Sequence, residues 1–86
     1  MSQTNKTRTT VDIYGKQYTI MGKANAHHVR MVATLVDDKM REIHAANKSL
    51  DTTKLAVLTA VNTMNDYMNL EKQYEELKRS IQMKEE

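Results

Sequence analysis

The feature that most constrains this chain is the uninterrupted stretch after Lys23, because neither proline nor glycine occurs from there to residue 86. Asp51 is a favourable N-cap for a helix beginning at Thr52, since its carboxylate can accept a backbone N–H of the first turn. At 1.5 Å of rise per residue, a helix over 52–84 is roughly 50 Å long. A small domain does not need such a helix to cover its own core, so the excess length predicts contact with something else.

The predicted long helix carries two different apolar stripes. In its first half an apolar cluster lies on one side, and Leu55 and Leu58 lie nearly opposite, which is typical of a helix buried between two layers. In its second half, over residues 69–86, apolar residues recur at the three- and four-residue spacing of a coiled coil. We expect both stripes to lie at interfaces between copies of the chain, formed by Val57, Val61, Met64, Met68, Leu70, Tyr74, Leu77 and Ile81. A frayed, solvated helix end is the alternative for the second stripe.

The composition also favours oligomerisation. The chain has 86 residues, no Phe, no Trp and no Cys, so seven Met and four Tyr must supply much of the apolar bulk. A domain of this size gains little stability from its own core, and such chains often add a disulfide, a metal or a partner subunit. Cysteine is absent and metal ligands are sparse, which leaves the partner subunit. Asn62, Asn65 and Asn69 share one face of the long helix and either fix the register of an interface or face solvent.

A β-hairpin is predicted over residues 9–21, where apolar and polar residues alternate on both sides of Gly15-Lys16. A type II′ turn with Gly15 and Lys16 at its centre suits glycine at a positive φ. In that register Tyr14 faces Gln17, Ile13 faces Tyr18, and Val11 faces Ile20. Apolar residues then pair on one face, which must lie on helices or on a partner because a lone hairpin is marginally stable in water.

A second helix is predicted over residues 25–46, with Asn25 as its N-cap. Its apolar stripe consists of Val29, Val32, Val36, Met40 and Ile43. The fold class is therefore α+β: an N-terminal β-hairpin, one medium helix, and one long C-terminal helix that extends into a coiled coil. We divide the chain into a mobile arm (1–7), a globular dimerising head (8–68) and a coiled-coil tail (69–86).

Catalysis and metal binding find little support in the residues. His27 and His28 point about 100° apart on a helix and, with His44, lack zinc-site spacing. Adjacent Asp37 and Asp38 also diverge, so we interpret them as a solvated face rather than an acid–base pair. The sequence has no glycine-rich phosphate loop and no Cys nucleophile. We therefore expect no enzyme activity and no cofactor. Two tyrosines flank the predicted turn; we expect Tyr18 in the core and Tyr14 as a partner contact or without a role.

Charge and hydropathy bear on the partner. The first ten residues are polar, which argues against a signal peptide and favours the cytoplasm. No segment approaches the roughly 20 apolar residues of a membrane span. The net charge of +2 does not imply nucleic acid. The alternative to a protein-binding adaptor is a small dimeric nucleic-acid-binding protein, in which Lys6, Arg8 and Lys16 contact phosphates. Asp12 within the hairpin and the scatter of the basic residues weigh against it.

Three segments in order resemble the ZapA family, small cytosolic proteins of the bacterial division ring. They are "TTVDIYGKQYTI" in the hairpin, "HHVRMVATLVDDKMREI" in the medium helix and "LDTTKLAVLTAVN" at the start of the long helix. Together they cover most of residues 9–62, and the chain looks most like the short form found in Gram-positive bacilli.

The resemblance implies a function in cell division and septation. It implies a head that dimerises, a C-terminal coiled coil, and dimers that can pair into tetramers. It also implies a non-catalytic protein that is recruited to mid-cell, binds the tubulin-like GTPase FtsZ and cross-links its filaments. By the same resemblance, Lys16 at the hairpin tip and Lys48 between the helices are candidate FtsZ contacts. The short tail leaves dimer and tetramer open.

Overall fold

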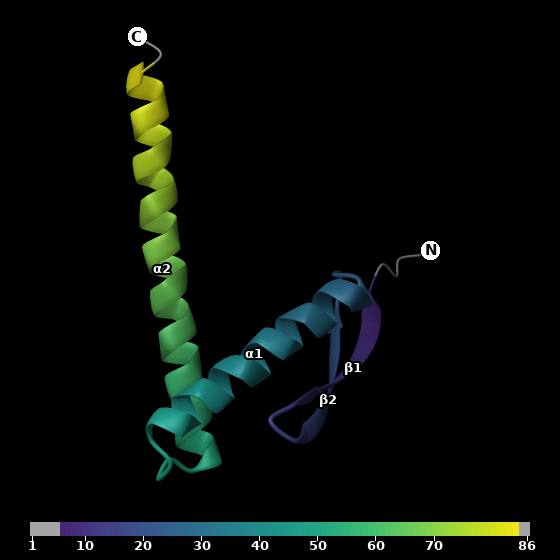
Figure 1. The fold of residues 1–86 in the computed structure, drawn as a ribbon. Coiled ribbons are helices and arrows are strands. Elements are labelled where there is room, and N and C mark those ends of the chain that lie inside the picture. Colours follow the sequence, from purple (N-terminus) through teal and green to yellow (C-terminus); the bar gives the residue numbers. More distant parts are fainter. Residues whose placement is uncertain (1–5, 85–86) are drawn as a thin grey trace.

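A computed structural model describes residues 6–84 of the chain. Two antiparallel strands, β1 (Thr7–Ile13) and β2 (Lys16–Gly22), precede the helices α1 (Ala26–Ala46) and α2 (Thr52–Lys84). The two helices meet near their connection and diverge from it, so that the chain forms an open V with the hairpin against α1 (Figure 1). The dimensions of 53 × 48 × 16 Å reflect this open shape. The predicted α+β architecture is confirmed.

The helix ends lie where the capping residues predict them. The Asn25 side chain accepts a hydrogen bond from the backbone N–H of His28 at 2.8 Å, which satisfies a free donor of the first turn of α1. The Asp51 carboxylate accepts from the N–H of Lys54 at 2.8 Å and caps α2 in the same way. At the other end of α1, the N–H of Asn47 donates to the carbonyls of Ile43 and His44. The predicted ranges of both helices are therefore confirmed.

The hairpin forms, but the predicted register and turn are wrong. Ile13 pairs with Lys16, Val11 with Tyr18 and Thr9 with Ile20. The central turn residues are Tyr14 and Gly15, with φ of 50° and 80°. Two positive φ values define a type I′ turn, whose twist matches that of the strands. The register is shifted by two residues, so the predicted face is kept while each predicted pair is lost.

The N-terminal boundary of the hairpin also differs from the prediction. Strand β1 already includes Thr7, which was assigned to the mobile arm. Residues 1–5 of that arm lie outside the described residues.

The buried core of the single chain is small. Val11 of β1, Ala33 and Met40 of α1, and Leu55 of α2 are its buried apolar residues, among those described. Strand β1 packs on α1, and α1 packs on the beginning of α2. The second half of α2 extends away from the other elements (Figure 1). Most large apolar side chains of the chain consequently remain exposed, which is unusual for a stable monomer.

Candidate interaction surfaces

All eight residues predicted at oligomer interfaces are exposed in the single chain. Each leaves between 50% and 64% of its surface uncovered. They form two stripes on α2, which we call the head stripe (Val57, Val61, Met64 and Met68) and the tail stripe (Leu70, Tyr74, Leu77 and Ile81). With 3.6 residues per turn, the two stripes point roughly 140° apart around the helix. One straight partner helix cannot cover both stripes without crossing from one side of α2 to the other.

Two hollows add to the apolar surface beside the head stripe. One, of about 360 Å³, lies between α1 and α2 and includes Met64 of the head stripe. The other, of about 340 Å³, lies between the hairpin and both helices and includes Tyr18, which was predicted in the core but is 47% exposed here. Both hollows are lined by Met40 and Ala56, so they form one continuous surface, which we call the trough. The trough and the head stripe together leave a wide apolar surface uncovered on the head.

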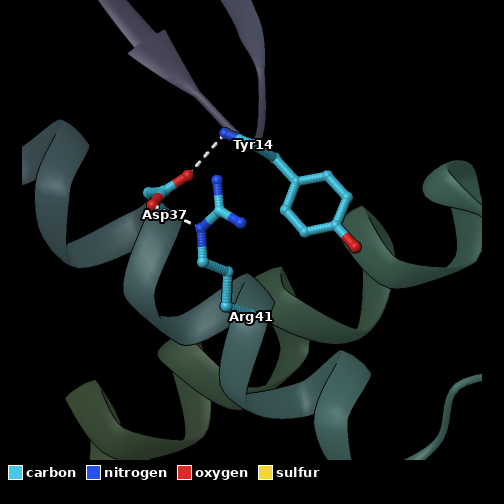
Figure 2. A network of polar contacts seen from close by, with 3 residues as sticks. All are labelled: Tyr14, Asp37 and Arg41. Atoms are coloured by element: carbon cyan, nitrogen blue, oxygen red, sulfur yellow. Dashed lines mark hydrogen bonds and ion pairs between the residues drawn. The ribbon is translucent and has the colours of Figure 1, made fainter.

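The hairpin tip is fastened to α1 by a small polar network (Figure 2). The backbone N–H of Tyr14 donates to Asp37 Oδ1 at 2.6 Å, and Nε of Arg41 donates to Asp37 Oδ2 at 2.8 Å. The guanidinium carbon of Arg41 lies 5.4 Å from the centre of the Tyr14 ring, a cation–π distance. The His44 ring meets the same tyrosine edge-on at 6.3 Å between centroids. We call these four residues the tip network.

The hydrogen bonds of the tip network favour the ionised forms of Asp37 and Arg41. The hydrogen bond from Arg41, followed by that from the Tyr14 N–H, lowers the pKa of Asp37 below its usual value. The same carboxylate raises the pKa of Arg41. Asp37 is therefore ionised at neutral pH, and both of its oxygens accept hydrogen bonds from ionised or backbone donors, which are the stronger kind.

The tip network explains the unexpected turn. A residue with a side chain at positive φ costs roughly 1–2 kcal/mol, and type I′ turns normally place Asn, Asp or Gly there instead. Tyr14 occupies this position with φ of 50° and donates its N–H to Asp37. The hydrogen bond and the ring contacts offset the cost of the turn. The interpretation of Asp37 as a solvated face is thus wrong, whereas Asp38 beside it is exposed.

The contacts of Tyr14 were not predicted from the sequence either, because this residue is half-buried against its own chain rather than left for a partner. One signal was available, namely the four-residue spacing of Asp37 and Arg41 on a predicted helix, which favours an ion pair. Nothing in the sequence indicates that the hairpin tip would contact this pair.

The two candidate lysines lie on different elements and both are exposed. Lys16 is the first residue of β2, directly after the turn, and lines the hairpin end of the trough. Lys48 lies in the connection between α1 and α2. Within residues 6–84, the side chain of neither lysine forms a hydrogen bond or an ion pair. The described residues contain no group of His, Asp or Glu arranged to hold a metal, and His27 and His28 are exposed at the start of α1.

The chain is similar to known cell division proteins over nearly its whole length. The profile of the family described as "Cell division protein ZapA" matches residues 9–86. A "Cell division protein ZapA" from Oceanobacillus iheyensis is 56% identical over all of both chains, and one from Bacillus pumilus is 58% identical over 99% of this chain and 98% of its own. Among solved structures, the "ZapA mutant dimer from Geobacillus stearothermophilus" is 44% identical, covers 95% of each chain and has a TM-score of 0.74. None of the helices within residues 6–84 has the length and apolarity to cross a membrane.

Proposed function

Because the chain belongs to the ZapA family of cell division proteins, we propose that it is a non-catalytic adaptor that binds FtsZ and cross-links its filaments. The proposed place of action is the cytoplasm, at the division ring of the mid-cell. The working unit is a homodimer, the state of the similar solved structure, which can pair further through its tails. Cross-linking of this kind requires no bond to be made or broken, only two or more copies of one site held at a fixed spacing.

The observation that carries the proposal is the exposure of both apolar stripes on α2. The head stripe, continuous with the trough, is the larger apolar surface and fits the interface between two heads. The tail stripe has the heptad spacing of a coiled coil and fits an interface between two α2 helices. With the chain divided in this way, the head (residues 8–68) forms the dimer. The tail (residues 69–86) holds the dimer, or a pair of dimers, together.

The site proposed for FtsZ lies at the hairpin tip and the interhelical connection. Lys16 and Lys48 are exposed basic side chains at these places, and a symmetric oligomer presents at least two copies of each. Weak contacts with individual FtsZ subunits then add up along a filament, because each further contact forms within one complex. Surface charges of this type affect binding without contributing much to the stability of the fold.

The test is co-sedimentation with FtsZ assembled in the presence of GTP. We expect the unmodified protein to pellet with the filaments and Lys16→Glu to pellet less, while its helical content and oligomer mass stay unchanged. Lys72→Glu, the same charge change on the exposed side of the tail, is the matched control and keeps binding. A lower oligomer mass for Lys16→Glu would show that this lysine is structural and that the site is wrongly assigned.

A further inference from the structure

We propose that Asp37 is a positioning residue that selects the register of the β-hairpin and thereby sets where Lys16 stands on the surface. The selection of register is a property of the free protein. Its effect on binding rests on the proposed function, because it assumes that Lys16 contacts FtsZ.

The sequence of the hairpin is compatible with two registers. In the observed one the turn is Tyr14-Gly15 and Val11 pairs with Tyr18. In the other, which the pattern of the sequence favours, the turn is Gly15-Lys16 and Val11 pairs with Ile20. The two differ by two residues, so side chains stay on the same face of the hairpin. Packing of the apolar face against α1 therefore discriminates poorly between them, and the choice falls to the turn.

Local turn chemistry alone favours the register that is not observed. The Gly15-Lys16 turn would place only glycine at a positive φ, whereas the observed turn puts Tyr14 there with φ of 50°. What the observed register gains is the tip network, in which the Tyr14 N–H meets Asp37 at 2.6 Å and the tyrosine ring meets Arg41 and His44. In the alternative register Tyr14 becomes a strand residue, and its backbone no longer occupies the turn position that faces Asp37.

Within residues 6–84, the bond from Tyr14 to Asp37 is the only hydrogen bond that joins the hairpin to a helix. The hairpin packs on α1 mainly through β1, while β2 is exposed along nearly its whole length, including Tyr18 and Ile20. The Asp37 carboxylate is itself held from the other side by Arg41 at 2.8 Å, so it presents a fixed acceptor to the tip (Figure 2). The network thus supplies the fixed point that the open hairpin lacks.

The register decides the position of Lys16. In the observed register Lys16 leaves the turn, begins β2 and stands opposite Ile13 at the hairpin end of the trough. In the alternative register it becomes a central turn residue at the extreme tip. A contact with FtsZ that depends on Lys16 is therefore made in one register and lost or displaced in the other, with the charge of the lysine unchanged.

The first test measures the register by NMR in the full-length oligomer. Directly opposed strand residues that do not exchange hydrogen bonds bring their Hα atoms close together. We expect a contact between the Hα atoms of Thr10 and Thr19 in the unmodified protein. In Asp37→Ala it is replaced by one between Val11 and Ile20, and φ of Tyr14 becomes negative. Asp37→Asn, whose Oδ1 still accepts the Tyr14 N–H, keeps the observed register, as does the control Asp38→Ala. Retention of the Thr10–Thr19 contact in Asp37→Ala would overturn the proposal.

A second variant separates positioning from simple stabilisation. Asn-Gly is the strongest type I′ turn sequence, so Tyr14→Asn restores the observed register in the Asp37→Ala background without the tip network. We expect Asp37→Ala to weaken co-sedimentation with FtsZ by about tenfold, and the double variant to recover most of the loss. If Asp37→Ala does not fold, the double variant decides alone. Folding in the observed register with binding retained supports the proposal, and failure to fold shows that Asp37 stabilises the head generally.

The proposed function and the positioning role of Asp37 are refuted by different results. If the unmodified protein does not sediment with FtsZ, the proposed function is wrong, while the NMR result on the register still stands. If the unmodified protein sediments and Asp37→Ala changes register without loss of binding, FtsZ binding does not depend on the place of Lys16, and the positioning role is refuted.

Discussion

Replacing Leu77 by alanine tests whether the tail stripe is an interface between subunits. Leu77 leaves 61% of its surface exposed in the single chain. Full burial of a leucine side chain contributes about 1.5–3 kcal/mol, so covering the part still exposed contributes at most about 1–2 kcal/mol per chain. A symmetric dimer contains two copies, which makes about 2–4 kcal/mol per dimer. The dissociation constant should therefore rise on the order of 30- to 1,000-fold.

Sedimentation velocity over a series of protein concentrations measures this shift directly. The matched control is Lys72→Ala, which removes a long side chain from the charged side of the same helix segment. Both substitutions introduce alanine, the best helix former, so neither weakens α2 itself. Equal dissociation constants for the two variants would show that Leu77 faces solvent in the oligomer and that the tail is a solvated helix end.

Three further predictions concern the head. Leu55→Ala should lower the free energy of unfolding by about 2–5 kcal/mol, because Leu55 is 1% exposed and alanine leaves a cavity; a urea titration showing less than about 1 kcal/mol would contradict its place in the core. Asn25→Ala should cost about 1 kcal/mol by removing the cap of α1, which a thermal melt would detect. Because the pKa of Asp37 is lowered in the folded protein, this residue contributes fully to the stability of the fold above the usual pKa of 3.8. That contribution is lost as the pH falls through the lower folded pKa. Protection of the Tyr14 amide from hydrogen exchange should drop over that range, and an unchanged protection would show that the carboxylate charge is irrelevant to the tip.

The helices were predictable from the sequence because their signals are local. Asn25 and Asp51 cap the two helices as their residue types predict, and the absence of proline and glycine lets α2 continue to Lys84. The two apolar stripes follow from spacing alone. The sequence indicates only indirectly that both stripes are exposed in the single chain, because the apolar pattern is too extensive for so small a core.

The turn was mispredicted because its determinant is distant in the sequence. Local chemistry favours Gly15-Lys16, and tertiary contact with Asp37, 23 residues away, selects Tyr14-Gly15 instead. The same distance explains why Asp37 was interpreted as a solvated side chain and Tyr14 as a partner contact. A hairpin whose two registers keep the same face outward gives the sequence no hydrophobic pattern with which to choose between them.

The central claim is that oligomerisation turns a weak FtsZ-binding site into a filament cross-link, and low-speed sedimentation of FtsZ filaments tests it most directly. Single filaments stay in solution at low speed, whereas bundles pellet. We predict that the full chain brings GTP-assembled FtsZ into the pellet, and that a chain ending at Asn69 keeps a folded dimeric head and binds filaments at high speed but brings less FtsZ into the low-speed pellet. Absence of a low-speed pellet with a properly folded full-length oligomer would contradict the account, and equal pelleting by the shortened chain would show that the tail is not the cross-linking device.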